Sequence, residues 1–128
     1  MNTRAMLISL SFLFMLSIGQ VHFLDALPGK FFEVYVNYLN TGTQDAKNAH
    51  IVLMIPELEI YDYSNTFDID DHGNGVSILF PYIPPDTKPG WYQLWTTLSN
   101  DDYRTWQFDW FYVASAPQCC STDSAPCP

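Results

Sequence analysis

Three histidines and a pair of adjacent carboxylates are the side chains of this sequence best suited to catalysis. His22, His50 and His72 are scattered, and no cysteine or serine stands with them in a recognisable nucleophile motif. Asp101 and Asp102 lie in a turn-forming segment, where solvated carboxylates are more common than an acid–base pair. The chain also lacks the insertions that would build a substrate pocket. The sequence therefore favours a protein that is not an enzyme.

The acidic segment from Asp68 to Gly73 partly matches a calcium-binding loop. Asp68 and Asp70 supply oxygen ligands at its first and third positions, and Gly73 stands at the sixth. The twelfth position is Leu79, where an EF-hand requires a bidentate glutamate. We therefore expect no metal and no cofactor here and interpret the segment as a hairpin tip. Weak calcium binding by residues 68–71 stays open.

All three cysteines stand in the last ten residues of the chain, as Cys119, Cys120 and Cys127. Their position excludes the cross-sheet disulfide of antibody domains. Outside a cell, Cys119 or Cys120 could close a small loop with Cys127, and the odd cysteine could link two chains. No histidine completes a zinc motif with them, so we expect a disulfide.

The length of the chain, its net charge and its first residues limit the classes of protein to which it can belong. A chain of 128 residues with a net charge of −9 holds at most one domain and offers no basic patch for nucleic acid. An apolar stretch at residues 6–19 follows Arg4, which is the pattern of a secretory signal peptide. We expect cleavage after Gly19, with Ala26 as the alternative, and a retained membrane anchor stays open. The predicted location is secreted or at the cell surface, with no other membrane contact.

Alternating apolar residues predict an all-β, immunoglobulin-like β-sandwich of about seven antiparallel strands. The signal peptide would occupy residues 1–19, the domain 20–113 and a Cys/Pro/Ser-rich tail 114–128. The strand candidates, some of them short or irregular, are residues 21–27, 31–39, 49–55, 58–63, 67–70, 76–82, 91–98 and 104–113. Four alternating residues are expected to point into the core from one of these segments: Val76, Ile78, Phe80 and Tyr82. We also expect a bulge near Asp109 and Trp110.

The same alternation predicts an apolar outer face. Trp91 and Trp95 point opposite to the core side of their strand, and Val52 and Met54 do so on a strand that neighbours it in such a sandwich. The last strand brings Trp106 and Trp110 in one row, although its outward row is not fixed by the pattern. Such a patch usually marks a partner surface, and tryptophan is enriched in binding hot spots. We therefore expect contact with a protein partner or self-association, with glycan binding and coverage by another segment of the chain as alternatives.

Turn and core residues of the chain resemble a known family. The stretch Val34-x-Val36-x-Tyr38-x-Asn40-Thr41-Gly42, then Ile55-Pro56-Glu57-Leu58, is similar to the front half of CARDB modules, the cell-adhesion-related domains of bacterial and archaeal surface proteins. Lys88-Pro89-Gly90-Trp91-Tyr92 and Leu98-Ser99-Asn100-Asp101-Asp102 are similar to the back half. The resemblance covers roughly residues 29–113. It implies an immunoglobulin-like module for adhesion or interaction on an exported protein, and it carries no catalytic residues.

Overall fold

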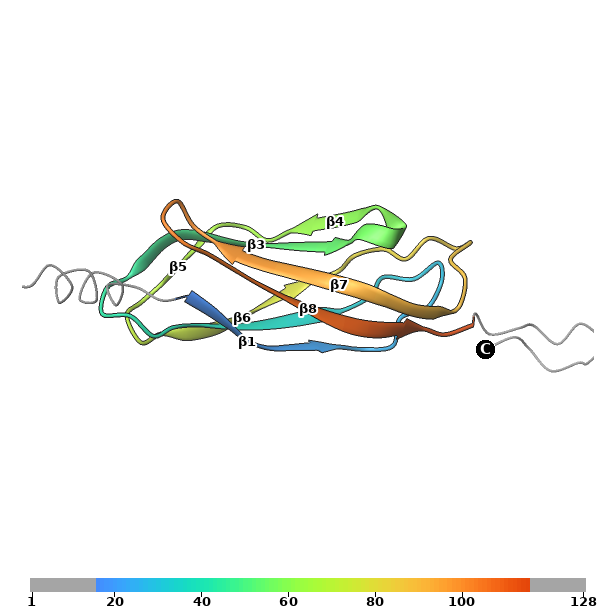
Figure 1. Ribbon diagram of the computed structural model, residues 1–128, viewed down its shortest axis with the longest axis horizontal. Helices are drawn as coiled ribbons and strands as arrows, with labels where there is room; N and C mark the ends of the chain where they lie inside the picture. The colour runs from blue at the N-terminus through green and yellow to red at the C-terminus, as the bar shows by residue number, and fades with distance from the viewer. Residues whose placement is uncertain (1–15, 116–128) are drawn as a thin grey trace, which may run out of the picture.

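The computed structural model describes residues 16–115, which form two antiparallel β-sheets packed face to face (Figure 1). The first sheet has the order β1 (Leu16–Phe23), β2 (Val34–Asn40), β6 (Asn74–Leu79). The second has the order β4 (Ile60–Tyr63), β3 (Ala46–Ile55), β7 (Gly90–Ser99), β8 (Arg104–Val113), with β5 (Phe67–Ile69) paired to the first half of β3. A short 3-10 helix, η1 (Pro56–Leu58), joins β3 to β4. The predicted all-β sandwich is confirmed, with eight strands instead of about seven.

The core lies between the two sheets and is centred on aromatic rings. Phe32 stacks on Phe111 with ring centroids 4.9 Å apart, and Phe23 meets both rings edge-on. Aliphatic residues from the inward positions of β2, β3 and β7 complete the core: Val34, Val36, Ala49, Ile51, Leu53, Ile55, Leu94 and Leu98. These are the positions that period-2 alternation assigns to the inside of a half-buried sheet. Within residues 16–115, no helix is long and apolar enough to cross a bilayer.

The prediction that Val76, Ile78, Phe80 and Tyr82 point into the core is wrong. All four are about half exposed, because the ladder between β2 and β6 sets Leu79 opposite Val34 and thereby turns the odd-numbered residues inward. A shift of one residue in register moves every side chain of a strand to the other face.

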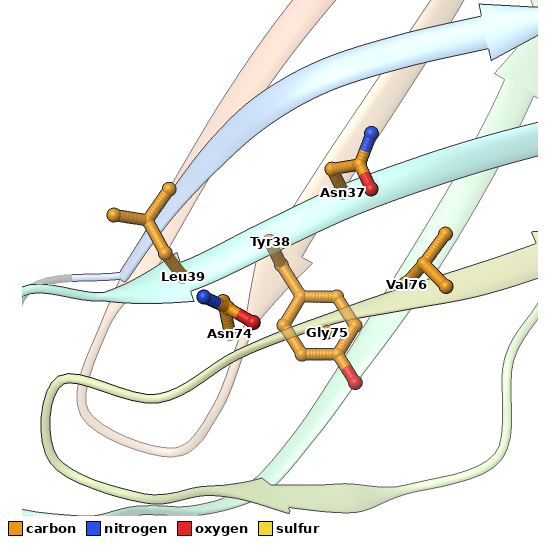
Figure 2. Close-up of a pocket in the computed structure, with 6 residues that line it drawn as sticks. All are labelled: Asn37, Tyr38, Leu39, Asn74, Gly75 and Val76. Carbon is orange, nitrogen blue, oxygen red and sulfur yellow. The ribbon is translucent and has the colours of Figure 1, made fainter.

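The inward row of β6 has little apolar bulk of its own, and an aromatic ring from β2 fills the space at Gly75. The ring of Tyr38, directly opposite on β2, lies across Gly75 and fills the space that a side chain would take (Figure 2). Tyr38 also stacks on Phe67 with ring centroids 4.6 Å apart and packs against the core. A large aromatic ring on one strand therefore covers a glycine on the next.

The hydroxyl of Tyr38 should make stability depend on alkaline pH. Burial raises the pKa of this group above its ordinary value. Its contribution to folding is therefore complete below the unfolded-state pKa of about 10 and is lost as the pH rises through the folded-state pKa. We expect Tyr38→Phe to flatten the decline in unfolding free energy above about pH 10, measured by urea denaturation. Parallel pH profiles for the two proteins would contradict this.

The first and last strands differ from the predicted ones in two further ways. The first strand begins at Leu16, within the segment expected to be a leader, and Leu16 is 1% exposed in the core. The β7–β8 ladder runs without a break from Gly90 opposite Val113 to Ser99 opposite Arg104, so the bulge expected on β8 is wrong. A bulge occurs instead on β1, between Ile18 and Val21.

Candidate interaction face

The outward side of the sheet formed by β4, β3, β7 and β8 carries a layer of large apolar side chains. We call this layer the aromatic face. It contains all four tryptophans of the chain, and its members are Val52, Met54, Tyr61, Tyr63, Trp91, Trp95, Trp106, Phe108, Trp110 and Tyr112.

Two rows of the aromatic face run across all four strands. In one row the ladders set Tyr61 opposite Met54, Met54 opposite Trp95, and Trp95 opposite Phe108. In the other row Tyr63, Val52, Thr97 and Trp106 follow one another in the same order of strands. Because directly opposite side chains on a sheet lie close enough to contact each other, the unbroken register makes these residues one surface.

The ring geometry divides the tryptophans into two groups. Trp95 lies against both Trp106 and Phe108, with centroids 5.3 Å away in each case and ring planes inclined by 35° and 30°. Its indole N–H donates to Gln93 Oε1 at 3.3 Å, which fixes the orientation of the ring. In this group Trp106 and Phe108 each cover part of the Trp95 ring.

The second group surrounds an open apolar hollow. Trp91 meets Tyr112 edge to face at 5.3 Å and 67°. Trp91 and Trp110 line a hollow of about 450 Å³. The exposed fractions are 64% for Trp91, 59% for Trp106 and 51% for Trp110. An exposed apolar patch of this kind usually marks a binding surface.

The six binding residues predicted from the sequence all lie on this face. Trp91, Trp95, Val52 and Met54 stand on β7 and β3, and the structure selects the even-numbered row of β8 as the outward one, which adds Trp106 and Trp110. Sequence reasoning missed Tyr61 and Tyr63 on β4. Their alternation was visible, but nothing local to β4 indicates that it pairs with β3.

Acidic groups stand beside the face. Glu57, on η1, accepts the backbone N–H of Gln93 through Oε1 at 3.3 Å, at a part of β7 that β3 does not reach. At the opposite end of β7, Asp101 and Asp102 are exposed in the turn that leads to β8. Arg104 is also exposed there and lies next to Trp106 in the outward row. With a net charge of −9 on the whole chain, the face is an apolar surface on an acidic molecule.

One possible nucleophile–base pair emerges in three dimensions that the sequence did not reveal. His50 Nε2 lies 3.4 Å from Ser99 Oγ, across the β3–β7 ladder. This distance exceeds the range of about 2.6–3.2 Å that such a pair needs. Ser99 is buried, and the hollows at the aromatic face are lined by Trp91, Trp110 and their neighbours instead.

The acidic segment from Asp68 to Gly73 is not the hairpin tip that the sequence predicted, because β5 pairs with β3 in one sheet and β6 pairs with β2 in the other. Carboxylates tie this segment to the start of β3. Asp68 Oδ1 accepts the N–H of Asn48 at 3.0 Å, and Asp45 Oδ1 accepts the N–H of Asp71 at 2.9 Å. Lys47 lies 3.6 Å from Asp68 and 3.9 Å from Asp45. Among residues 16–115, no group of three or more His, Cys, Asp or Glu side chains is arranged to hold a metal ion. Cys119, Cys120 and Cys127 lie outside the described residues.

The architecture defines the class of the protein as a small antiparallel β-sandwich, and comparison with solved structures narrows it. The CARDB domain of a Pyrococcus furiosus protein, crystallised in complex with two metal ions, superposes with a TM-score of 0.59 at 16% identity and covers 81% of this chain and 90% of its own. A solution structure of the same domain gives 0.57 at 16% identity, with 78% and 93% covered. The resemblance to CARDB domains is therefore confirmed as a likeness of fold.

Larger proteins contain a similar sandwich. An alkylpurine DNA glycosylase from Pseudomonas fluorescens, bound to DNA with an abasic site analog, matches with a TM-score of 0.56 at 13% identity. The match covers 88% of this chain and 34% of the glycosylase, so this chain corresponds to about a third of that protein. No family model and no curated protein matches the sequence.

Proposed function

We propose that this protein is an exported, non-catalytic module that binds a protein partner, or a second copy of itself, at the cell surface through the aromatic face. The observation that carries the proposal is the pair of rows that cross four strands, apolar at every position except Thr97, while Trp91, Trp106 and Trp110 remain more than half exposed. Burial of about 100 Å² of apolar surface contributes roughly 2.5 kcal/mol, so several such rings supply ample energy for association.

The ring orientations favour a protein partner over a sugar. A carbohydrate ring stacks on the open face of an aromatic ring, whereas Trp106 and Phe108 already cover part of the Trp95 ring. Ring edges and the grooves between rings suit apolar and aromatic side chains of a protein, which pack edge-to-face as readily as they stack.

The charges near the face would orient the partner. Glu57, Asp101 and Asp102 stand at opposite ends of β7, so a basic rim on the partner would be attracted and a second acidic copy would be repelled. Added salt should therefore weaken binding to a basic partner and strengthen self-association, because it screens the charges in both cases.

Glycan binding is the second candidate, and the hollow between Trp91 and Trp110 supports it. This hollow of about 450 Å³ is open and apolar, and a sugar ring could lie against either indole. Titration of the intrinsic tryptophan fluorescence with cell-wall or matrix polysaccharides tests this candidate. A saturable change that Trp91→Ser abolishes would move glycan binding ahead of protein contact.

The proposal is tested by the double variant Trp106→Ser/Trp110→Ser. We expect the wild type to self-associate in light scattering after size exclusion, or to bind a purified surface protein of its own cell. The double variant should lose association through the aromatic face by at least about 100-fold, since two hot-spot tryptophans contribute about 2 kcal/mol or more each. Phe31→Ser, which removes an exposed ring on the other sheet, is the matched control. Equal binding by the double variant and the wild type would contradict the proposal.

A further inference from the structure

Besides β5, which is only three residues long, the two sheets of residues 16–115 have four outer edge strands, and three of these four carry features that discourage pairing with another chain. β1 is interrupted by a bulge, and β4 is four residues long and contains Asp62. β8 is bridged by Ala26 at Val113 and holds Asp109 opposite Leu94, on the side that faces the other sheet. Bulges, short length and inward-pointing charges are the usual protections of an exposed edge.

β6 differs from these three strands. Its sequence, from Asn74 to Leu79, contains no charged residue and no proline, and its register with β2 is unbroken over six pairs. No strand of the described part of the chain pairs with its other side. A regular, uncharged edge strand with exposed apolar side chains is a template for β-pairing.

The hydrogen bonds beside β6 identify which backbone groups face the free edge. Asn40 N–H donates to Gly73 O at 2.9 Å, and Phe32 N–H donates to Pro81 O at 2.7 Å, in register with the β2–β6 ladder. Since bonded pairs alternate along an antiparallel ladder, odd-numbered residues of β6 bond to β2. The N–H and C=O groups of Val76 and Ile78 therefore point away from β2.

An independent contact agrees with this assignment. Phe80, the next even-numbered residue, donates its N–H away from β2 to Asp62 Oδ2 at 3.1 Å. This bond closes the edge beyond Leu79 and leaves Val76 and Ile78 as its open part. Their side chains, half exposed on the outer face of the sheet, lie beside Asn37 and Tyr35 of β2.

We propose that β6 is a self-association edge, at which the β6 strands of two copies pair antiparallel about a two-fold axis at Ser77. In this arrangement Val76 of each copy faces Ile78 of the other, and their outward backbone groups form about four hydrogen bonds. Two three-stranded sheets become one sheet of six strands. The same patch on both copies serves as donor and acceptor, as a two-fold interface requires.

The uncharged edge at β6 is compatible with a second copy as the occupant, although the molecule as a whole is acidic. Each copy carries a net charge of −9, so most surfaces of two copies repel each other. The segment from Asn74 to Leu79 is uncharged, and the apolar pairing of Val76 with Ile78 excludes water from the new hydrogen bonds. At this edge, two acidic copies can therefore meet without placing like charges against each other within the paired strands.

Amide hydrogen exchange of the wild-type protein tests the edge directly. We expect the N–H groups of Val76 and Ile78 to become protected as the protein concentration rises, while amides of exposed turns do not change. The measurement requires no variant, so it stands even if a substitution impairs folding. Exchange rates of these two amides that are independent of concentration up to about 1 mM, a range that covers weak dimers, would overturn the proposal.

A charge on the edge provides the second test. Ile78→Lys should weaken dimerisation by about tenfold or more, measured by sedimentation equilibrium. The new lysine of each copy would lie in the interface, near the same lysine of the other copy, and the two charges would repel each other. His22→Lys, the same addition on the exposed side of β1 at the opposite edge, is the control and should dimerise like the wild type. Trp106→Ser/Trp110→Ser should keep the protection of Val76 and Ile78, which separates this interface from the aromatic face. Unchanged dimerisation of Ile78→Lys would refute pairing at β6.

Discussion

Replacing Phe111 by alanine is expected to lower the free energy of unfolding by about 3–5 kcal/mol. Phe111 is 1% exposed, stacks on Phe32 and contacts the rings of Phe23 and Tyr92. Its removal would take the central ring out of the aromatic cluster that joins both sheets and would leave a cavity that stiff β-strands fill poorly. For a domain whose total stability is about 5–15 kcal/mol, such a loss approaches the limit of folding at 37 °C.

The neighbouring residue offers a matched control. Tyr112 is as large as Phe111, but it points outward and is 49% exposed, in edge-to-face contact with Trp91. Tyr112→Ala should therefore reduce stability by about 1 kcal/mol or less. Urea denaturation followed by far-UV circular dichroism compares the two variants on equal terms. Similar losses of unfolding free energy for the two variants would contradict the assignment of Phe111 to the buried row of β8 and Tyr112 to the exposed row.

The alternation of the sequence was sufficient to predict the strands at the centre of the sandwich. In β2, β3 and β7 one row is almost entirely apolar, and residues such as Val36, Leu53 and Leu94 are fully buried as expected. The outward placement of Trp91 and Trp95 followed from the same rows. Where one row is clearly more apolar than the other, the buried face of a strand is determined by its own residues.

That argument fails where both rows are apolar or where bulk comes from another strand. On β6 the more apolar row, with Val76 and Ile78, faces outward, because the ring of Tyr38 fills the inner side at Gly75. On β8 both rows contain aromatic residues, so the choice depends on the register with β7. Long-range pairing, which the sequence does not display, decides both cases.

The aromatic face was predictable in outline because it rests on strand periodicity, whereas the edge at β6 was not. An edge is defined by the absence of a neighbouring strand, and sheet order depends on contacts between distant segments. The strand candidates at residues 58–63 and 76–82 gave no sign of which sheet each would join. The proposal for Val76 and Ile78 therefore depends on topology, and the proposal for the aromatic face depends mainly on sequence.

A chain that begins at Gln20, as cleavage after Gly19 would produce, is expected to be less stable than a chain that begins at residue 15 by about 2–4 kcal/mol. The shorter chain lacks Leu16, which is buried, and Ile18, which packs against the core. It also lacks the ladder pairs that set Leu16 opposite Asn40 and Ile18 opposite Tyr38. Part of the loss is offset, since ordering each residue of β1 costs about 1–2 kcal/mol.

Asn40 makes the first half of β1 more important than its length suggests. Its side chain is buried and joins three segments, because Nδ2 donates to Gln44 O at 2.7 Å and to Ile69 O at 3.2 Å, and Oδ1 accepts the N–H of Gly42 at 2.9 Å. Leu16 lies directly opposite it on β1. Without Leu16, water would reach these hydrogen bonds, and the turn that follows β2 should loosen.

Single substitutions in the longer chain separate packing from chain length. Leu16→Ala should reproduce about 2 kcal/mol or more of the loss, and Ser17→Ala, on the outward row of β1, should cost little. Thermal and urea unfolding of the two chain lengths and the two variants complete the comparison. Equal stability of the two chain lengths would show that the sandwich tolerates processing after Gly19. The expected loss would mean that cleavage at this point opens the end of β2, and that a stable secreted form needs either a cleavage site before Leu16 or another strand in its place.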